Sequence, residues 1–498
     1  MLPVIRRRPR ARMGRRTERS TGPSWPRQSR PVPVGLTLLG MLGSGVAEFE
    51  ISASGGILVA RWHLLALLAG WSLAFAVAAR SLVQLPRRTA MGLLVAGTLA
   101  FTGLAVAGHP ELSDDLYRYA WDGHVQASGI DPYRYSPDDP RLSGLRDPWL
   151  WPDPAGCAQL HRPAGCTRLN RPDARTIYPP VAQEYFRFLH ATGLTSWRER
   201  GLQLPAAVAH LALTGLLLAA LRSLGRDPRR AVLYAWCPLA LLETGMDAHV
   251  DVLAVGLAVG AVWAMERRRS AVAGLLLGFG TAVKLLPALL LPVALRRPAT
   301  LAGRNAAVRR WTTVLGCWTA VLGLAYLPHV LAVGPAVLGY LPNYLQEENY
   351  GSGSRFLLLG LIGLSGRVAQ DVALVVIAGA AGWSLLRRHA PAARVAVELT
   401  GIVFLVVTPV QPWYALLLVA LAAFAGRAEW LLVALAGYPL YFAAVLNGNM
   451  TVLGRLPYGI AAVGVIAATG VRHFGEPGRV RHPAPSKPDS PDAAAARN

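Results

Sequence analysis

Adjacent carboxylates, Asp114 and Asp115, stand near the start of the longest polar interval in the chain, which directly follows an apolar run. A carboxylate beside a substrate hydroxyl can take its proton, which is general-base catalysis. Ser113 is a good helix N-cap, and the spacing predicts a helix with these residues on one face: Asp115, Arg118, Tyr119 and Asp122. Asp114 is rotated from that face by about 100° and is better placed to cap. Asp115 is therefore the first candidate base and Asp114 the second, with an ordinary capped surface helix as the alternative.

Positive charge comes from arginine almost everywhere in this chain, which contains two lysines, Lys284 and Lys487. Lys284 stands between apolar neighbours, where a compact ammonium group suits the binding of an anion such as a phosphate. A lysine that snorkels from a helix end toward the surface is the alternative interpretation. Arg355 is the second candidate for binding the same anion.

A histidine, His249, lies between two acidic residues, Asp247 and Asp251. The three could bind a metal ion or relay a proton, or His249 could be a satisfied interfacial histidine. We expect no metal ion, and we predict that His249 and Asp251 contact substrate. Four aromatic residues are further candidates for substrate contacts: Tyr119, Tyr178, Trp413 and Tyr414. Two of these adjoin prolines, so simple helix breaking is an alternative explanation for them.

The composition is typical of a polytopic membrane protein. Of the 498 residues, 53% are hydrophobic and only 16% are charged, and apolar runs recur along the chain. The net charge of +22 is dispersed in short arginine clusters between apolar runs. This is the positive-inside pattern of membrane proteins, so nucleic acid is not an expected partner. The expected fold class is an all-α bundle in an inner or plasma membrane.

The apolar runs predict about 14 membrane segments, with both termini cytoplasmic. Residues 1–33 and 473–498 are predicted disordered tails, and residues 34–472 a membrane domain with a first outer loop at 108–202. Around Lys284 we expect two half-spanning helices, and Phe356–Leu364 should be interfacial or re-entrant. The other expected segments are 34–47, 57–79, 90–107, 203–221, 231–246, 249–265, 312–333, 368–386, 394–409, 413–426, 429–446 and 455–471.

This topology brings the unusual polar residues to the outer face. They are Asp114, Asp115, Tyr178, Asp247, His249, Asp251, Lys284, Arg355, Gln411, Asn447 and Asn449. Ionisable residues at membrane depth are costly unless they line an aqueous cavity, so their convergence predicts an outward-facing site. Cys157 and Cys166 lie in the same outer loop and could form a disulfide if that loop faces an oxidising compartment.

An ordered set of motifs resembles the GT-C fold glycosyltransferases, most closely the bacterial polyprenol-phosphate-mannose-dependent mannosyltransferases. The set is Asp115 four residues before Tyr119, Gly129-x-Asp131-Pro132-Tyr133, Asp247–Asp251, Lys284-x-x-Pro287 and Pro412-Trp413-Tyr414. It extends over residues 34–470. The chain departs from the pattern with two adjacent acids where many relatives have one, and with a longer first outer loop that contains two cysteines.

The resemblance implies transfer of a hexose, mannose first, from a polyprenyl-phosphate donor to a lipid or glycan acceptor. The leaving phosphate is already a stable anion, so the reaction needs one base and cations but no general acid and no cofactor. Direct displacement with one base inverts the anomeric configuration. A transporter or flippase of lipid-linked sugars is the alternative from another class, although it should show internal repeats and polar residues at the bilayer midplane. A lipid-linked glycan ligase or polymerase is the third reading.

Overall fold

The computed structural model describes residues 32–110, 112–297 and 303–475. Within these ranges the regular structure is entirely helical, which confirms the all-α prediction. The predicted tails at 1–33 and 473–498 lie almost wholly outside the described residues. Eight helices in the described part are long and apolar enough to cross a membrane: Pro33–Ser52, Ala60–Leu82, Arg87–Ala107, Glu199–Ser223, Arg304–Glu347, Gly366–Leu386, Ala428–Val445 and Thr451–Arg472.

The expected number of about 14 membrane segments is not confirmed, because several apolar runs form helices too short to cross. The helices α10 (Asp251–Glu266), α11 (Ser270–Val283) and α17 (Ala392–Val407) have 16, 14 and 16 residues, and α18 (Leu416–Ala425) has 10. A spanning helix needs about 20 residues. Short helices are tolerated at membrane depth when protein surrounds them, and all but the last residue of α18 are buried.

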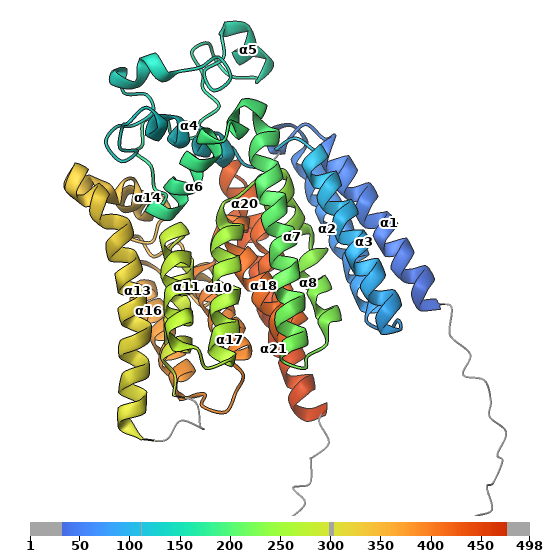
Figure 1. The fold of residues 1–498 in the computed structure, drawn as a ribbon. Helices are drawn as coiled ribbons and strands as arrows, with labels where there is room; N and C mark the ends of the chain where they lie inside the picture. Colours follow the sequence, from blue (N-terminus) through green and yellow to red (C-terminus); the bar gives the residue numbers. More distant parts are fainter. Residues whose placement is uncertain (1–31, 111, 298–302, 476–498) are drawn as a thin grey trace, which may run out of the picture.

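The long helices stand side by side in a bundle (Figure 1). Helices α1 (Val32–Ser52), α2 (Ile57–Leu82) and α3 (Arg87–Ala107) form one flank, while α13 (Arg304–Val333) lies against α11 on the opposite flank. Between the flanks, α7 (Glu199–Ser223), α10 and α18 form the interior. Of the short helices, α18 is enclosed by the others, whereas α11 exposes Val272, Leu275 and Phe279 at the surface of the bundle.

Most of the predicted outer loop folds into a helical cap at one end of the bundle (Figure 1). The cap contains α4 (Asp115–Ala127), α5 (Pro154–Gln159) and α6 (Pro180–Ala191). Tyr119 of α4 stacks on Phe186 of α6 with ring centroids 4.4 Å apart, inside a continuous apolar core. Cys157 and Cys166 are joined in a disulfide, as the sequence allowed. The cap is therefore an ordered part of the fold that can position residues for chemistry.

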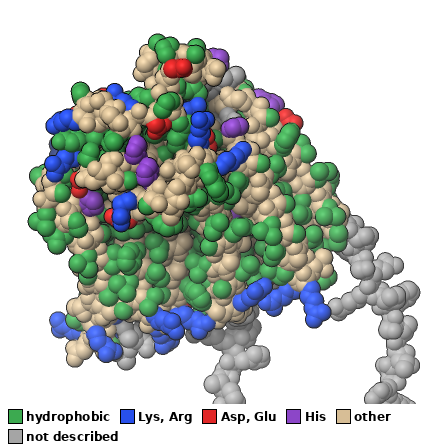
Figure 2. Space-filling model, turned by 45° about the horizontal axis from the view of Figure 1, so that its top comes forward, with side chains coloured by type: hydrophobic (Ala, Val, Ile, Leu, Met, Phe, Trp, Pro, Cys, Tyr) green, Lys and Arg blue, Asp and Glu red, His purple; other side chains and the backbone are tan. Residues whose placement is uncertain are grey.

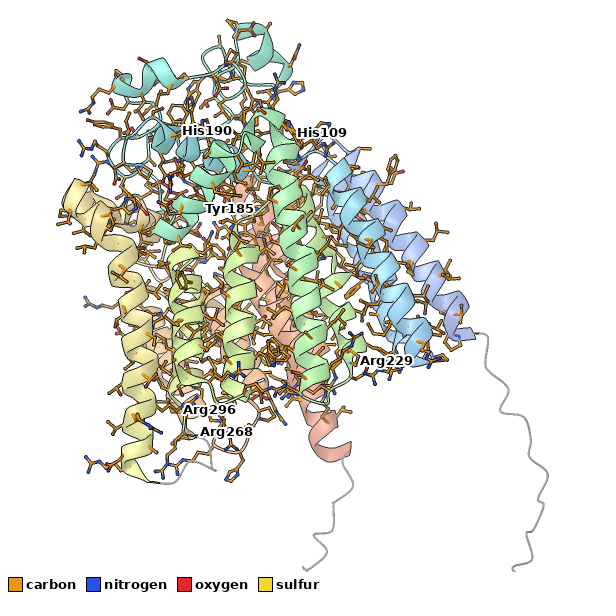
Figure 3. The ribbon with its side chains drawn as sticks, in the orientation of Figure 1. His109, Tyr185, His190, Arg229, Arg268 and Arg296 are labelled. Carbon is orange, nitrogen blue, oxygen red and sulfur yellow. A yellow bond between two sulfur atoms is a disulfide. The ribbon has the colours of Figure 1, made fainter. Side chains whose placement is uncertain are left out.

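Charged side chains lie at both ends of the bundle, above and below an apolar band (Figure 2). Figure 3 places Arg229, Arg268 and Arg296 at the end of the bundle opposite the cap. His109 and His190 lie at the cap end. In Figure 2, Lys and Arg gather along the lower rim, below an apolar band, whereas basic, acidic and histidine side chains all lie above it. A basic rim on one side of an apolar band is what the positive-inside rule describes. Cytoplasmic termini stay a prediction.

As predicted, the helical path is broken at Lys284. Helix α11 ends at Val283, and Lys284 has the extended backbone angles φ −151° and ψ 138°. A 3-10 turn, η5 (Leu286–Leu290), and a short helix, α12 (Leu291–Leu295), follow. Because Arg268 and Arg296 lie at the same end of the bundle, the chain goes up and returns between them (Figure 3). Lys284 is therefore placed inside the protein, away from the basic rim.

Candidate active site

The Asp115 carboxylate is held by hydrogen bonds to both of its oxygens. Helix α4 begins at Asp115, whose Oδ2 accepts from the Tyr178 hydroxyl at 2.8 Å and whose Oδ1 accepts from the Asn170 amide at 2.6 Å. Tyr178 lies just before α6, where Tyr133 donates to its carbonyl oxygen at 2.7 Å. Three distant segments of the cap thus fix the orientation of one carboxylate.

The surroundings of Asp115 favour its ionised form. Burial alone would raise the pKa of Asp115, but the charges of His249 and Lys284 oppose it. Hydrogen bonds from Tyr178 and Asn170 act in the same direction, and the net pKa lies below the ordinary value for an aspartate. Asp115 is therefore ionised at neutral pH, as a general base must be.

The prediction that Asp114 caps the helix is wrong. Asp114 occupies the N-cap position in place of Ser113, yet its side chain makes no capping hydrogen bond. Its Oδ2 instead accepts from Arg162 at 2.7 Å, a charge-assisted bond that is stronger than a cap bond. Ser113 accepts the backbone N–H of Asp115 at 3.2 Å. Asp114 is thus committed to an ion pair at the mouth of the site.

Lys284 is embedded among one carboxylate and two aromatic rings. Its Nζ donates to Asp251 Oδ2 at 3.1 Å, and it lies 5.2 Å from the ring centroid of Tyr178 and 5.1 Å from that of Tyr414. Its place at the C-terminal end of α11 also favours a cation, because the helix dipole is negative there. These contacts hold the ammonium group inside the protein. Lys284 is therefore not a lysine that extends from a helix end toward the surface.

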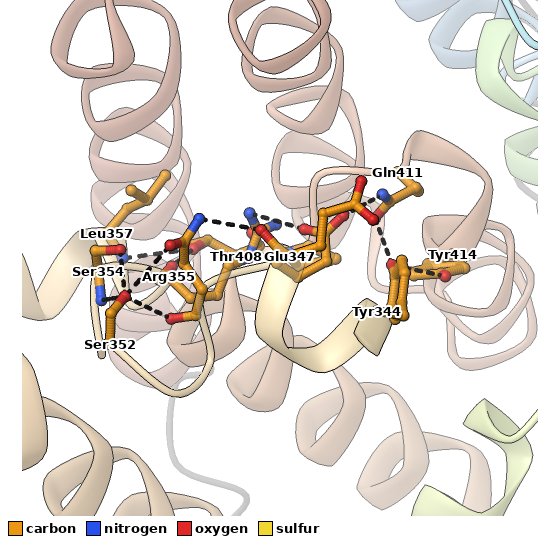
Figure 4. A network of polar contacts seen from close by, with 12 residues as sticks. Tyr344, Glu347, Ser352, Ser354, Arg355, Leu357, Thr408, Gln411 and Tyr414 are labelled. Atoms are coloured by element: carbon orange, nitrogen blue, oxygen red, sulfur yellow. Dashed lines mark hydrogen bonds and ion pairs between the residues drawn. The ribbon is translucent and has the colours of Figure 1, made fainter. Parts of the chain in front are cut away.

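Arg355 lies in a polar network between α14 (Leu341–Glu347), the segment that follows it and the end of α17 (Figure 4). Its Nη2 donates to the Thr408 carbonyl at 2.6 Å, and its Nη1 is 3.4 Å from Glu348 Oε2. Glu348 also accepts from Gln411 at 2.7 Å, and the Tyr344 hydroxyl donates to Gln411 Oε1 at 3.0 Å. Arg355 therefore already has one carboxylate partner, unlike a cation reserved wholly for a ligand.

One cavity of about 1430 Å³ brings most of the predicted residues together. Its walls include Asp114, Asp115, Tyr178, Lys284, Arg355, Gln411, Trp413 and Tyr414. Arginines from the cap, among them Arg168 and Arg175, line the same space, and apolar side chains such as Val445 and Met450 line another part. The cavity thus combines the ionised Asp115 carboxylate with several cations, aromatic rings and an apolar border, which suits an amphipathic anionic substrate.

Three predicted substrate-binding residues lie behind the cavity wall. Tyr119, His249 and Asp251 are at most 3% exposed and do not line the large cavity. Tyr119 and His249 contact one another at 3.5 Å, and Asp251 holds Lys284. They support the cavity residues from beneath.

Of the remaining residues predicted at the outer face, Asp247 accepts the backbone N–H of Leu112, and Asn449 accepts the backbone N–H groups of Thr451 and Val452. Neither these two nor Asn447 lines the cavity.

The sequence did not reveal three residues that complete the site. Asn170 holds Asp115, Glu348 pairs with Arg355, and Glu243 lies 3.2 Å from His249. Glu243 carried a usable signal, since an acidic residue in a predicted apolar crossing marks function by default. Asn170 and Glu348 stand in polar loops, where no pattern distinguishes them from solvated residues.

Comparison with known protein families gives one match. Residues 177–409 match the family model described as glycosyltransferase family 87. The matched segment contains Tyr178, His249, Lys284 and Arg355, whereas Asp115 and Trp413 lie outside it. No curated protein and no solved structure matches the chain. Together with the apolar helices, the family match indicates a glycosyltransferase embedded in a membrane.

Proposed function

We propose that this protein transfers a hexose, with mannose as the first candidate, from a polyprenyl-phosphate carrier to a lipid or polysaccharide acceptor. The observation that carries the proposal is the cavity in which the Asp115 carboxylate and the Lys284 ammonium group both face substrate space. The donor class rests on the resemblance to the GT-C mannosyltransferases, and the site would lie at the outer face of a bacterial plasma membrane.

The reaction follows from the side chains at the cavity wall. Asp115 takes the proton of the acceptor hydroxyl as its oxygen attacks the anomeric carbon. The bond from that carbon to the phosphate oxygen breaks, and the phosphate leaves with the electron pair. Lys284 and Arg355 stabilise the departing anion, while Trp413 and Tyr414 offer ring faces to the sugar. Attack from the side opposite the leaving group inverts the anomeric centre.

The first test is transfer itself. Membrane vesicles with and without this protein are incubated with radiolabelled polyprenyl-phosphate mannose, and label is followed into new lipid or polysaccharide. We expect protein-dependent transfer, and no transfer when a nucleotide sugar replaces the lipid donor. If the protein instead only moves the intact labelled lipid from one leaflet to the other, the protein is a flippase and the proposal fails.

A further inference from the structure

Glu243 is a carboxylate buried within the helical bundle. It lies in η4 (Leu242–Met246), just before the turn that contains His249, and is 1% exposed. Its Oε1 accepts from the Tyr438 hydroxyl at 2.7 Å, and its Oε2 is 3.2 Å from His249 Nε2. A charge buried this deeply is costly unless it is paired. The imidazole of His249 supplies the pair.

His249 lies between Glu243 and Asp115. Its Nε2 faces Glu243, whereas its Nδ1 is 3.8 Å from Asp115 Oδ2 and 3.5 Å from the Tyr119 hydroxyl. Trp413 stacks on the imidazole with ring centroids 4.1 Å apart and an interplanar angle of 17°. The ring is fully buried, and Trp413 forms part of the cavity wall. His249 therefore reaches Asp115 without contacting substrate.

Other titratable groups around this arrangement have partners of their own. Asp251 pairs with Lys284, and the Tyr178 hydroxyl donates to Asp115. Asp247 accepts the backbone N–H of Leu112, and the Tyr441 hydroxyl donates to the carbonyl of Leu112. The charge of His249 is thus set chiefly by the carboxylate in contact with it, Glu243, and by the one it faces, Asp115.

We propose that Glu243 and His249 form a positioning pair, in which the imidazolium braced by Glu243 keeps the Asp115 carboxylate ionised and turned toward the acceptor hydroxyl. This inference rests on the proposed function, because it assigns a role in support of the base. A carboxylate on one side of an imidazole favours the charged ring, and a charged ring favours an ionised carboxylate on its other side. His249 transfers no proton in this role and is not a catalytic residue.

The test is the pH profile of mannose transfer for His249→Gln and Glu243→Gln. Loss of the positive charge on His249 raises the pKa of Asp115. As the pH is lowered, the rate of transfer should therefore begin to fall at a higher pH than it does in the unsubstituted protein. We expect the acid limb to move upward by about one pH unit in both variants, with the maximal rate recovered at high pH. Glu243→Asp, which keeps the charge, should restore most of the original profile.

His210→Gln is the matched control. His210 is also fully buried and stacks on an aromatic ring, that of Tyr234 at 4.9 Å, but it lies in α7 away from the cavity. Its profile should keep the original acid limb. An equal fall at every pH in His249→Gln and Glu243→Gln, or an unchanged limb in Glu243→Gln, would overturn the inference. Should Asp115→Asn and Asp114→Asn both retain normal transfer, the proposed function fails before this inference is reached.

Discussion

At the scale of single residues, the central feature of the site is the capacity of the Asp115 carboxylate to accept further hydrogen bonds. Each of its oxygens already accepts one hydrogen bond, from Tyr178 and from Asn170. A carboxylate oxygen has a second lone pair, so each can still accept an incoming hydroxyl proton. The held orientation lowers the reorganisation needed for proton transfer, and the lowered pKa of Asp115 keeps the group ionised.

Lys284 gives the residue-scale prediction. Lys284→Met removes one charged contact to the donor phosphate, so we expect donor affinity to fall at least about 10-fold, the effect of losing about 1.5–3 kcal/mol. Transfer should slow as well, because the leaving phosphate loses a stabilising charge. The measurement is binding of polyprenyl-phosphate mannose to the purified protein, followed by initial rates.

A paired variant separates this effect from a folding defect. Removing Lys284 alone leaves the Asp251 carboxylate buried without its cation, which destabilises proteins by about 3–5 kcal/mol. Lys284→Met combined with Asp251→Asn removes the pair as a unit. We expect equally weak donor binding in the double variant; restored binding there would show that Lys284 acts only on the fold.

At the scale of elements, the sequence predicts the positions of the important segments better than their lengths. The helix from Asp115, the break at Lys284 and the pairing of Cys157 with Cys166 are each indicated by local signals: charge placement, a polar residue in an apolar run, and cysteine spacing. The membrane count fails because hydropathy reports burial, and lipid and protein bury side chains alike.

Long-range contacts explain what else could not be predicted. Asn170 meets Asp115 across 55 residues, and Tyr438 meets Glu243 across 195. No local periodicity encodes such pairs. The sequence places Tyr119 and His249 on the correct face, yet only the packed structure shows that Trp413 separates His249 from the cavity. A residue's depth within the site is a property of the whole bundle.

At the scale of the whole molecule, the basic rim below the apolar band makes a topological prediction (Figure 2). Arginine clusters at the end opposite the cap should face the cytoplasm. Reporter fusions at Asp227 and Gly303 should therefore report the cytoplasm, and fusions at Pro154 and Gly353 the outside. A cytoplasmic signal from Pro154 would put the cap and its cavity on the wrong side for a lipid-linked donor.

The most direct test of the central claim is Asp115→Asn, measured for both mannose transfer and donor binding. The substitution keeps the shape of the side chain but removes its basicity, and general-base catalysis contributes about 10²–10⁴-fold. We expect transfer to fall by at least about 100-fold with donor binding largely intact, whereas Asp114→Asn, which breaks only the pair with Arg162, should cost far less. Near-normal transfer in Asp115→Asn with none in Asp114→Asn would exchange the two roles, and normal transfer in both would contradict an aspartate-dependent glycosyltransferase.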